Sequence, residues 1–236
     1  SIVHALGTAG TGGFGIKADS IASYSHFCQW VITVFMLLFG VSFNMYYLLL
    51  IKRWREVLKS NELKCYLGIS LAAMIIVVLS IMPLYGSIAD AVRLSAFQVS
   101  SIVTTTGYAT ADFDAWPSLA KAVLLILMFF GGCMGSTAGG LKMSRVTVLA
   151  QIARNDLRHA LRPREVSTVI LNGRRVDAQG ERQILSYFAL YIAVIGAVFL
   201  LISFEPFGIE TNFSATVSCV NNIGPGFGQV GPSLSY

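Results

Sequence analysis

The chain contains the stretch SSIVTTTGY at residues 100–108, and this stretch decides the expected fold because two related stretches occur elsewhere. These are LGTAGTGGF at residues 6–14 and VSCVNNIGP at residues 217–225. Each has a run of small, weakly polar residues, then a glycine, then a residue with a ring. A pattern that recurs along a chain indicates a repeated structural unit. The sequence therefore predicts three copies of one unit, centred on Gly13, Gly107 and Gly224.

The composition is typical of a membrane protein. Charged residues make up 12% of the 236 residues, about half of the ~25% found in soluble domains. Apolar residues make up 55%, and the mean hydropathy is +0.67. These values exclude a disordered chain, a coiled coil and a disulfide scaffold. The four cysteines stand singly, at spacings that fit neither a zinc site nor a disulfide framework: Cys28, Cys65, Cys133 and Cys219.

Several apolar segments are long enough to cross a membrane, which takes roughly 20 residues. Three are strongly apolar and long enough, around 27–51, 66–86 and 184–204. A fourth, at 119–150, begins as a span but runs into GGCMGSTAGG, whose many glycines cannot sustain a continuous helix. We therefore expect a break there at membrane depth.

Segments 94–111 and 211–236 lack charged residues but are rich in Ser, Thr, Gly and Asn. Each follows a strongly apolar span and contains a short helix-like piece that ends near a glycine. Non-helical backbone at membrane depth must be buried in protein or line a water-filled cavity. We interpret both as re-entrant loops, which gives an all-α membrane protein built from span–re-entrant pore loop–span units.

The basic residues predict the orientation of the spans. Residues 52–64 and 142–182 hold most of the 17 Lys and Arg residues but only half of the 12 acidic residues. The positive-inside rule places both segments in the cytoplasm, so that all three glycine-centred loops open on the outer side. The positive charge is thus a topology signal. Trp54 is the only Phe, Trp or Tyr within the two basic segments, too few for aromatic interleaving, so we expect no nucleic-acid partner.

The repeated stretches are suited to binding a cation through backbone oxygens. Peptide carbonyls can replace the hydration shell of a cation, and Gly permits the dihedral angles that turn successive carbonyls to one side. The C-terminal end of a preceding helix would add partial negative charge. None of the three loops contains Asp or Glu, which argues against a calcium-type carboxylate ring. The alternative is that the small residues only allow close helix packing.

These stretches resemble the selectivity-filter segments of the Trk/Ktr/HKT superfamily of potassium transporters, and most closely those of bacterial TrkH/TrkG membrane subunits. Members of that family place four such units around one pore with pseudo-fourfold symmetry. The resemblance implies that this chain is a fragment covering roughly the second to fourth repeats. It also implies that potassium is the transported ion, that no organic cofactor is needed, and that the protein forms a homodimer in the bacterial inner membrane.

By the family pattern, the residues just before each filter glycine offer carbonyl oxygens to potassium. The resemblance assigns the filter to Thr11, Gly12, Gly13, Thr105, Thr106, Gly107, Asn222, Ile223 and Gly224. The adjacency of Gly12 and Gly13 leaves the register of the first segment open by one residue. Asn221 and Asn222 depart from a Thr-rich filter, and their side chains are expected to support the loop from behind.

The Gly-rich segment 131–140 resembles the intramembrane gating loop of the same subunits. We expect it to block the pore and withdraw; the alternative is a packed kink. The residues assigned to it are Gly131, Gly132, Gly135, Ser136, Thr137, Gly139 and Gly140. A phosphate-binding loop is excluded because Leu141 follows where Lys is required.

Other polar residues near the predicted membrane boundaries have less specific roles. Lys142 and Arg145 lie at the inner end of a span, where they could influence the inner pore mouth or only anchor the helix at the interface. His4 and His26 have no partner constellation, so a packing or interfacial role is expected.

The segment that follows is soluble in character. Residues 166–171, Asn172-Gly173 and residues 174–176 predict a β-hairpin with a tight turn. The resemblance implies that a cytoplasmic, nucleotide-binding regulatory subunit of the TrkA type docks on this side. The hairpin could contribute to that contact or be only a solvated, positively charged loop.

The sequence thus predicts five parts: 1–51, the end of a pore loop and a span; 52–64, a cytoplasmic loop; 65–150, a complete repeat; 151–183, a cytoplasmic loop with the hairpin; and 184–236, a span and a pore loop. The predicted function is potassium transport. A sodium-permeable or non-selective relative is the first alternative, although glycine at all three filter positions favours potassium. A membrane-embedded enzyme is the second, and the three strongly apolar spans hold no charged residues that could serve it.

Overall fold

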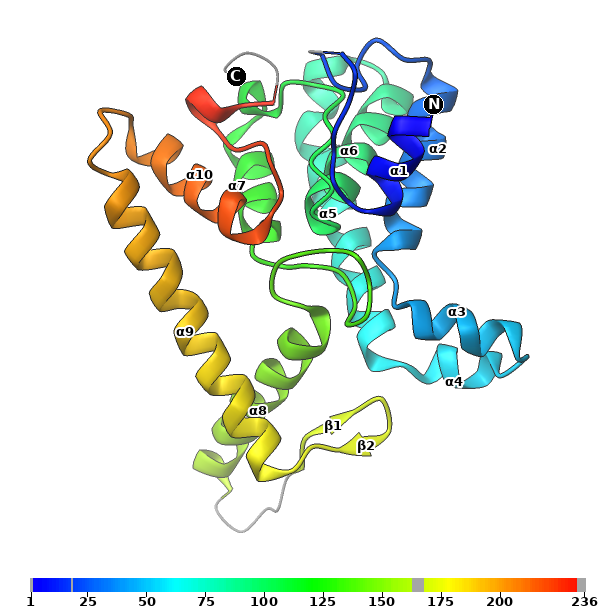
Figure 1. Cartoon of the computed structure of the whole chain (residues 1–236), viewed down its shortest axis with the longest axis vertical. Helices are drawn as coiled ribbons and strands as arrows, with labels where there is room; N and C mark the ends of the chain where they lie inside the picture. The colour runs from blue at the N-terminus through cyan, green and yellow to red at the C-terminus, as the bar shows by residue number, and fades with distance from the viewer. Residues whose placement is uncertain (1, 18, 163–167, 233–236) are drawn as a thin grey trace.

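The computed structural model describes residues 2–17, 19–162 and 168–232, which form helices joined by loops and one small hairpin (Figure 1). In chain order the elements are α1 (Ile2–Ala9), α2 (His26–Phe39), α3 (Phe43–Leu50), α4 (Trp54–Lys59), α5 (Asn61–Tyr85), α6 (Ile88–Val103), η1 (Phe113–Ala115), α7 (Ser118–Leu127), α8 (Met143–Leu161), β1 (Ile170–Leu171), β2 (Arg174–Arg175), α9 (Ala178–Ile202), α10 (Ile209–Asn221) and η2 (Gly228–Val230).

Two of these helices carry the membrane-spanning signal. Among the described residues, α5 and α9 are each long and apolar enough to cross a bilayer, and the α2–α3 pair would be a third span if taken as one. Only 22% of the most apolar window of α5 and 11% of that of α9 are buried inside the chain. An apolar surface of this extent suits lipid rather than water.

The pore-loop helices pack on the spans that precede them. Helix α5 lies along α6, and α9 lies along α10, which is the repeated arrangement that the sequence predicts. Helix α1 and η2 lie toward one end of the molecule and the hairpin lies at the other (Figure 1). The basic hairpin and the Gly-centred loops are therefore separated along the long axis.

The segment predicted to span the membrane at 27–51 forms two helices with a sharp bend between them. Helices α2 and α3 meet at an angle of 90°, at a break of three residues that begins with Gly40. Gly is a poor helix former, and the backbone groups freed by the break find partners elsewhere. The Gly40 carbonyl accepts from the Cys133 amide (2.8 Å), and the Phe43 amide donates to the Gly135 carbonyl (3.0 Å).

The helix break predicted after residue 130 is present. Helix α7 ends at Leu127 and α8 begins at Met143, with non-helical backbone between them. At ~1.5 Å per residue, the ten residues of α7 extend about 15 Å, roughly half of a bilayer core. The helix that begins as a span therefore stops part of the way across.

The helices extend further than expected into the segments predicted to be cytoplasmic loops. The predicted loop 52–64 contains α4 and the first turn of α5, whose N-cap Ser60 accepts from the Leu63 amide (3.3 Å). The predicted loop 151–183 contains the second half of α8 and the start of α9, capped by Asp177. Side-chain caps of this kind fix helix starts among polar residues, where hydropathy gives no boundary.

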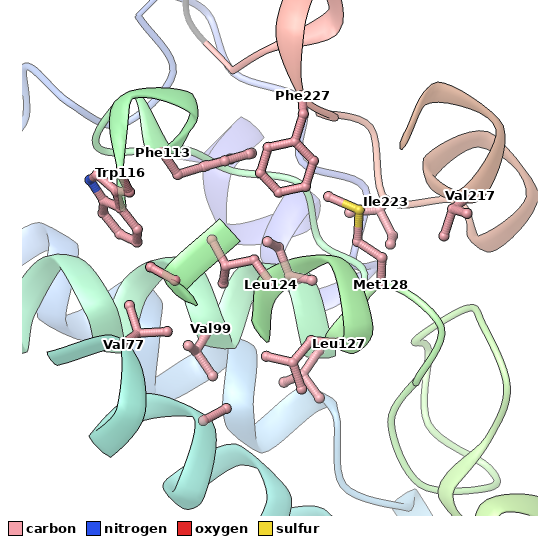
Figure 2. Packing of buried hydrophobic residues seen from close by; sticks show 14 of the residues in the cluster. Val77, Val99, Phe113, Trp116, Leu124, Leu127, Met128, Val217, Ile223 and Phe227 are labelled. Atoms are coloured by element: carbon pink, nitrogen blue, oxygen red, sulfur yellow. The ribbon is translucent and has the colours of Figure 1, made fainter. Parts of the chain in front are cut away.

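The largest apolar core joins the last pore loop to the middle repeat (Figure 2). Phe227 contacts Phe113 edge-to-face, with ring centroids 5.3 Å apart. Leu124 and Met128, from α7 and the residue after it, are fully buried beside Ile223 of the last pore loop. The position of the last pore loop is thus set by apolar packing against α7 and η1.

The packing around Gly40, at the break between α2 and α3, can be tested by substitution. A Cβ on Gly40 would lie 2.3 Å from the Tyr66 hydroxyl oxygen and 2.9 Å from Thr104 Cγ2. Tyr66 is fully buried and donates to the Leu37 carbonyl (3.0 Å), so it has little room to move. We expect Gly40→Ala to lower the free energy of unfolding by about 1–3 kcal/mol, measured by thermal unfolding in detergent.

The matched control is Gly68→Ala in the interior of α5. A Cβ there would meet no atom within 4 Å, so the substitution should be neutral or stabilising by up to about 1 kcal/mol. Equal stability of the two variants would contradict the packing described for the break.

Candidate functional site

The three glycine-centred segments share one backbone conformation. Each contains a residue in the left-handed region where its helix ends, namely Thr11 (φ 49°), Thr105 (φ 54°) and Asn222 (φ 58°). Two residues later each has a glycine with positive φ: Gly13 (66°), Gly107 (87°) and Gly224 (110°). The shared pattern fixes the register of the first segment, in which Gly13 and not Gly12 is equivalent to Gly107.

The hydrogen bonds repeat in the same way. The amides of Thr11, Thr105 and Asn222 donate to carbonyls three residues back, at 3.2, 3.0 and 3.2 Å. The amides of Gly12, Thr106 and Ile223 donate to carbonyls five residues back, at 2.8, 2.8 and 2.9 Å. This is the Schellman pattern of helix ends. Because these amides point back into the helices, the segments' own carbonyls are left to face other partners.

Adjacent segments touch through their backbones. A Cβ on Gly13 would lie 2.1 Å from the Thr106 carbonyl oxygen, and a Cβ on Gly107 would lie 2.0 Å from the Ile223 carbonyl oxygen. The Cβ position of Gly224 is 3.9 Å from Gly107 Cα. The three predicted segments are therefore brought together, and Gly13 and Gly107 each face the residue that precedes the next glycine.

Side chains of the filter segments are held behind the backbone. Thr104 and Thr106 share a hydroxyl–hydroxyl bond of 2.7 Å, and the Ser101 hydroxyl donates to the Tyr108 carbonyl (2.6 Å). The Asn221 side chain accepts from the Tyr191 hydroxyl (2.7 Å) and donates to the Val217 carbonyl (2.8 Å). The expectation that Asn221 supports its loop from behind is therefore confirmed, whereas Asn222 is exposed.

Tyr108 connects the second segment to the first. Its side chain is fully buried, and its hydroxyl donates to the carbonyls of Phe14 (3.3 Å) and His4 (3.4 Å). The His4 ring packs edge-on against Tyr24, with centroids 5.1 Å apart, which is the packing role expected for this histidine. The ring residue after the filter glycine thus ties two repeats together.

The Gly-rich loop lies against the filter segments. The Gly139 amide donates to Thr105 Oγ1 (2.6 Å), and Thr11 Oγ1 donates to the Thr137 carbonyl (3.0 Å). A Cβ on Gly139 would lie 2.4 Å from the Asn221 carbonyl oxygen. Residues 137–139 therefore contact all three segments at the C-terminal ends of their helices.

The two strands of this loop approach closely at its base. The Gly131 amide donates to the Leu141 carbonyl (2.9 Å), and a Cβ on Gly131 would lie 2.0 Å from the Gly139 carbonyl oxygen. A Cβ on Gly132 would lie 2.6 Å from the Gly40 carbonyl oxygen. Gly135 and Gly140 have positive φ, 78° and 64°. The Ser136 hydroxyl donates to the Cys133 carbonyl (2.6 Å).

The two basic residues assigned to the inner pore mouth lie in different surroundings. The Lys142 ammonium donates to the Ser136 carbonyl (3.2 Å) and to the Ala138 carbonyl, so it belongs to the loop. The Arg145 guanidinium lies over the Tyr187 ring of α9, 4.0 Å from its centroid. Only Lys142 is therefore in contact with the predicted gating residues.

Sequence reasoning missed three contributors to this site. Glu62 accepts hydrogen bonds from the loop, Gly40 supplies a carbonyl to it, and Tyr108 bridges two repeats. A signal existed for Gly40, which interrupts a predicted span. Glu62 lies in a mostly basic segment, whose charges the positive-inside rule explains without a role for this carboxylate.

Neither metal-ligand chemistry nor disulfide bonding accounts for the site. Across residues 2–17, 19–162 and 168–232, no three His, Cys, Asp or Glu side chains lie close enough to hold a metal ion. All four cysteines are free thiols. The groups gathered at the filter segments are instead backbone carbonyls and small hydroxyls.

Comparison with known proteins gives a consistent family. A family model for TrkH, described as a cation transport protein, matches residues 1–236. The chain is 30% identical over 99% of its length to the Trk system potassium uptake protein TrkG of Escherichia coli strain K12, and 28% identical over its whole length to TrkH of that strain. It covers 49% and 50% of those two relatives, so it spans about half their length.

The fold is that of a solved transporter. The crystal structure of the potassium transporter TrkH from Vibrio parahaemolyticus superposes with a TM-score of 0.89 at 27% identity, covering 97% of this chain and 50% of that one. The predicted class, an all-α membrane protein of repeated span and pore-loop units, is confirmed by this match. Because the relatives are transport proteins, the alternative of a membrane-embedded enzyme is not supported. The chain belongs to the TrkH family of cation transport proteins.

Proposed function

We propose that this chain conducts potassium across the bacterial cytoplasmic membrane through a filter of backbone carbonyls. The observation that carries the proposal is the identical backbone of the three segments, which meet at one place with their amides turned away. The filter oxygens come from the residues before each glycine: Thr11, Gly12, Thr105, Thr106, Asn222 and Ile223. The names of the relatives, which are potassium uptake proteins, point to the same ion.

The chemistry of such a filter is the exchange of water for protein oxygens. A dehydrated cation must be offered oxygens at little cost, and fixed carbonyls do this because they need no rearrangement when the ion arrives. Alternating left- and right-handed dihedral angles turn successive carbonyls to the same side, which Gly permits without strain. The Ile223 side chain is 3% exposed and anchored in the core, which restrains its carbonyl.

Helix ends add a favourable field. Helices α1, α6 and α10 each end directly before a filter segment. The C-terminal end of a helix carries partial negative charge, about half an elementary charge, and three such ends favour a cation between them. No carboxylate is present in the three segments, which suits a monovalent ion better than calcium.

A sodium-permeable relative is the competing proposal for the same site. Glycine at positions 13, 107 and 224 favours potassium, and a side chain at Gly13 or Gly107 would displace the neighbouring carbonyl. The two proposals differ in whether sodium competes with potassium for uptake: it should compete well only in the sodium-permeable relative.

The Gly-rich loop is proposed as the gate. Its residues 137–139 touch the segments just beyond the helix ends, on the side from which an ion would leave the filter. Lys142 holds the loop carbonyls of Ser136 and Ala138 together, and its charge would oppose a cation there. A loop in this position closes the path, and its withdrawal opens it.

The proposed assembly is a homodimer in the inner membrane with a cytoplasmic, nucleotide-binding regulatory subunit of the TrkA type. Within the described residues the turn Asn172-Gly173 has the positive φ angles of a tight hairpin (50° and 79°), as predicted; residues 166 and 167 of the predicted hairpin lie outside them. Arg174 and Arg175 are exposed on its second strand. This basic strand is the proposed docking surface.

Rescue of a potassium-uptake-deficient bacterial strain tests the function. The protein as its gene encodes it should restore growth at low potassium, and Gly107→Ser should abolish rescue. The serine Cβ would lie 2.0 Å from the Ile223 carbonyl oxygen, and the residue would be held at φ 87°.

The control is Gly86→Ser, at the C-cap of α5. Gly86 also has positive φ (63°), but a Cβ there meets no atom within 4 Å, so rescue should persist. Rescue by both Gly107→Ser and Gly86→Ser would reject the filter. Potassium uptake that sodium inhibits as strongly as unlabelled potassium does would favour the sodium-permeable proposal.

Shortening the loop tests the gate. Deletion of residues 135–139 should raise basal rubidium flux into proteoliposomes several-fold, because the contacts to Thr105 and Thr11 are lost. The point variant Gly139→Ala should act in the same direction, since its Cβ would lie 2.4 Å from the Asn221 carbonyl oxygen. Unchanged basal flux in both would reject the gate.

Removal of residues 172–175 tests docking and should abolish co-purification of the regulatory subunit. Because the deletion also removes Asn172, the charge-only variant Arg174→Glu/Arg175→Glu is the sharper form and should weaken binding at least tenfold. Exposed Arg154→Glu on α8 is the control for a general loss of positive charge. Intact binding in the double variant would leave the hairpin as a solvated loop.

A further inference from the structure

We propose that Glu62 is a positioning residue that holds the intramembrane loop in its pore-blocking place, and that the cytoplasmic hairpin controls it through Asn172. The inference rests on the proposed gate and adds the route by which the cytoplasmic side reaches it. The juxtaposition joins three segments that are far apart in sequence: the start of α5, the Gly-rich loop with the start of α8, and the β1–β2 turn.

Glu62 is a buried carboxylate with backbone partners in the loop. It lies in the first turn of α5 and is 3% exposed. Its Oε1 accepts from the Met134 amide (2.5 Å) and from the Ser144 amide (3.1 Å). Met134 belongs to the loop and Ser144 to the first turn of α8. One carboxylate oxygen thus fixes one strand of the loop relative to the helix that follows it.

Charge makes these contacts stronger than ordinary hydrogen bonds. A carboxylate acceptor roughly doubles the strength of an amide hydrogen bond, and a buried carboxylate left without donors is strongly unfavourable. The Ser144 amide lies at a helix N-terminus, where negative charge is favoured. Displacement of Met134 would therefore remove one of the backbone donors that compensate the burial of Glu62, alongside the Ser144 amide, the Asn172 side chain and the Lys142 charge.

The hairpin turn reaches the same helix start. Asn172 Oδ1 accepts from the Ser60 hydroxyl (2.9 Å) and lies 3.5 Å from the Glu62 amide. Ser60 is the N-cap of α5. Asn172 thus contacts both the N-cap Ser60 and the backbone of Glu62, and so helps to fix the start of α5 from which the Glu62 side chain projects.

The hairpin is fixed to α8 by a second contact. The Gln151 side chain donates to the Ile170 carbonyl (2.9 Å) and accepts from the Ile170 amide (3.0 Å). Val169, just before β1, is buried. A force applied to the exposed hairpin strand therefore reaches α8 and the α5 start together.

Space is available beside the loop. A cavity of about 710 Å³ is lined by loop residues Met134 and Gly135, by Glu62, and by the hairpin residues Asn172 and Arg174. The loop can move toward this cavity without first displacing packed side chains. We call Glu62 with its Met134 and Ser144 amide donors the clamp. The clamp and the hairpin line the same cavity, so the proposed control by the hairpin and the proposed movement of the loop occur side by side.

The direction of the effect follows from linkage. The Glu62 contacts are made while the loop touches the filter segments, so they favour that arrangement over any in which Met134 has moved away. Losing them shifts the population toward the open state. A partner that pulls the hairpin turn off α5 would have the same effect.

The experiment measures basal rubidium flux in proteoliposomes, using the protein as its gene encodes it. Glu62→Ala should raise flux roughly tenfold, since a charged hydrogen bond is worth about a factor of ten or more in an equilibrium. Glu62→Gln, which keeps the oxygen but not the charge, should give a smaller rise. Glu56→Gln is the matched control, because the exposed Glu56 carboxylate pairs with Arg53 rather than with a loop amide.

The hairpin arm avoids changing a buried charge. Asn172→Gly tolerates the positive φ but removes the Oδ1 acceptor, and should raise basal flux in the same direction as Glu62→Gln. Asn172→Asp retains an acceptor oxygen and should leave flux near the unmodified level. This pair keeps the proposal testable even if Glu62→Ala fails to fold.

The decisive readout is non-additivity with the loop deletion. If Glu62 acts by positioning the loop, Glu62→Gln should add nothing to the flux of a protein that lacks residues 135–139. An equal added rise in the deleted background, or unchanged flux in Glu62→Gln and Asn172→Gly while the deletion alone raises flux, would overturn the clamp. Unchanged flux on deleting the loop would instead reject the gate on which the clamp depends.

Discussion

The site depends on contact between backbones without side chains between them. Gly13 faces the Thr106 carbonyl and Gly107 faces the Ile223 carbonyl at distances that no Cβ could share. Each close approach sets the position of one filter segment from its neighbour, so the geometry is passed from one repeat to the next. Glycine is required here twice over, by the positive φ and by the missing side chain.

The surrounding structure keeps those contacts in place with polar and apolar support. Hydroxyls of Ser101, Thr104 and Ser218 bind backbone groups behind the segments, and Tyr108 reaches the carbonyls of the preceding repeat. On the far side of the last segment, Ile223 is anchored among Phe227, Leu124 and Met128 (Figure 2). The proposed filter segments are thus tied to helices, while the Gly-rich loop contacts them through hydrogen bonds from Thr11 and to Thr105.

The sequence predicted the repeats, the break after residue 130 and the Asn172-Gly173 turn, because each depends on local chemistry. Glycine content, charge-free length and turn residues act within a few positions of one another. It failed at Gly40, where a long apolar run hid a 90° bend, and at Glu62, whose role comes from contacts with Met134 and Ser144 some 70–80 positions away. Hydropathy has no information about which amide a distant loop will present, so long-range polar contacts of this kind need the folded chain.

The bend between α2 and α3 has a consequence for water. Its freed groups are satisfied by the loop, through the Cys133 amide on the Gly40 carbonyl and the Phe43 amide on the Gly135 carbonyl (Figure 1). A withdrawal of the loop as proposed would leave these four backbone groups without partners at once, and solvent would have to replace them. The proposed opening would therefore include hydration of the bend between α2 and α3.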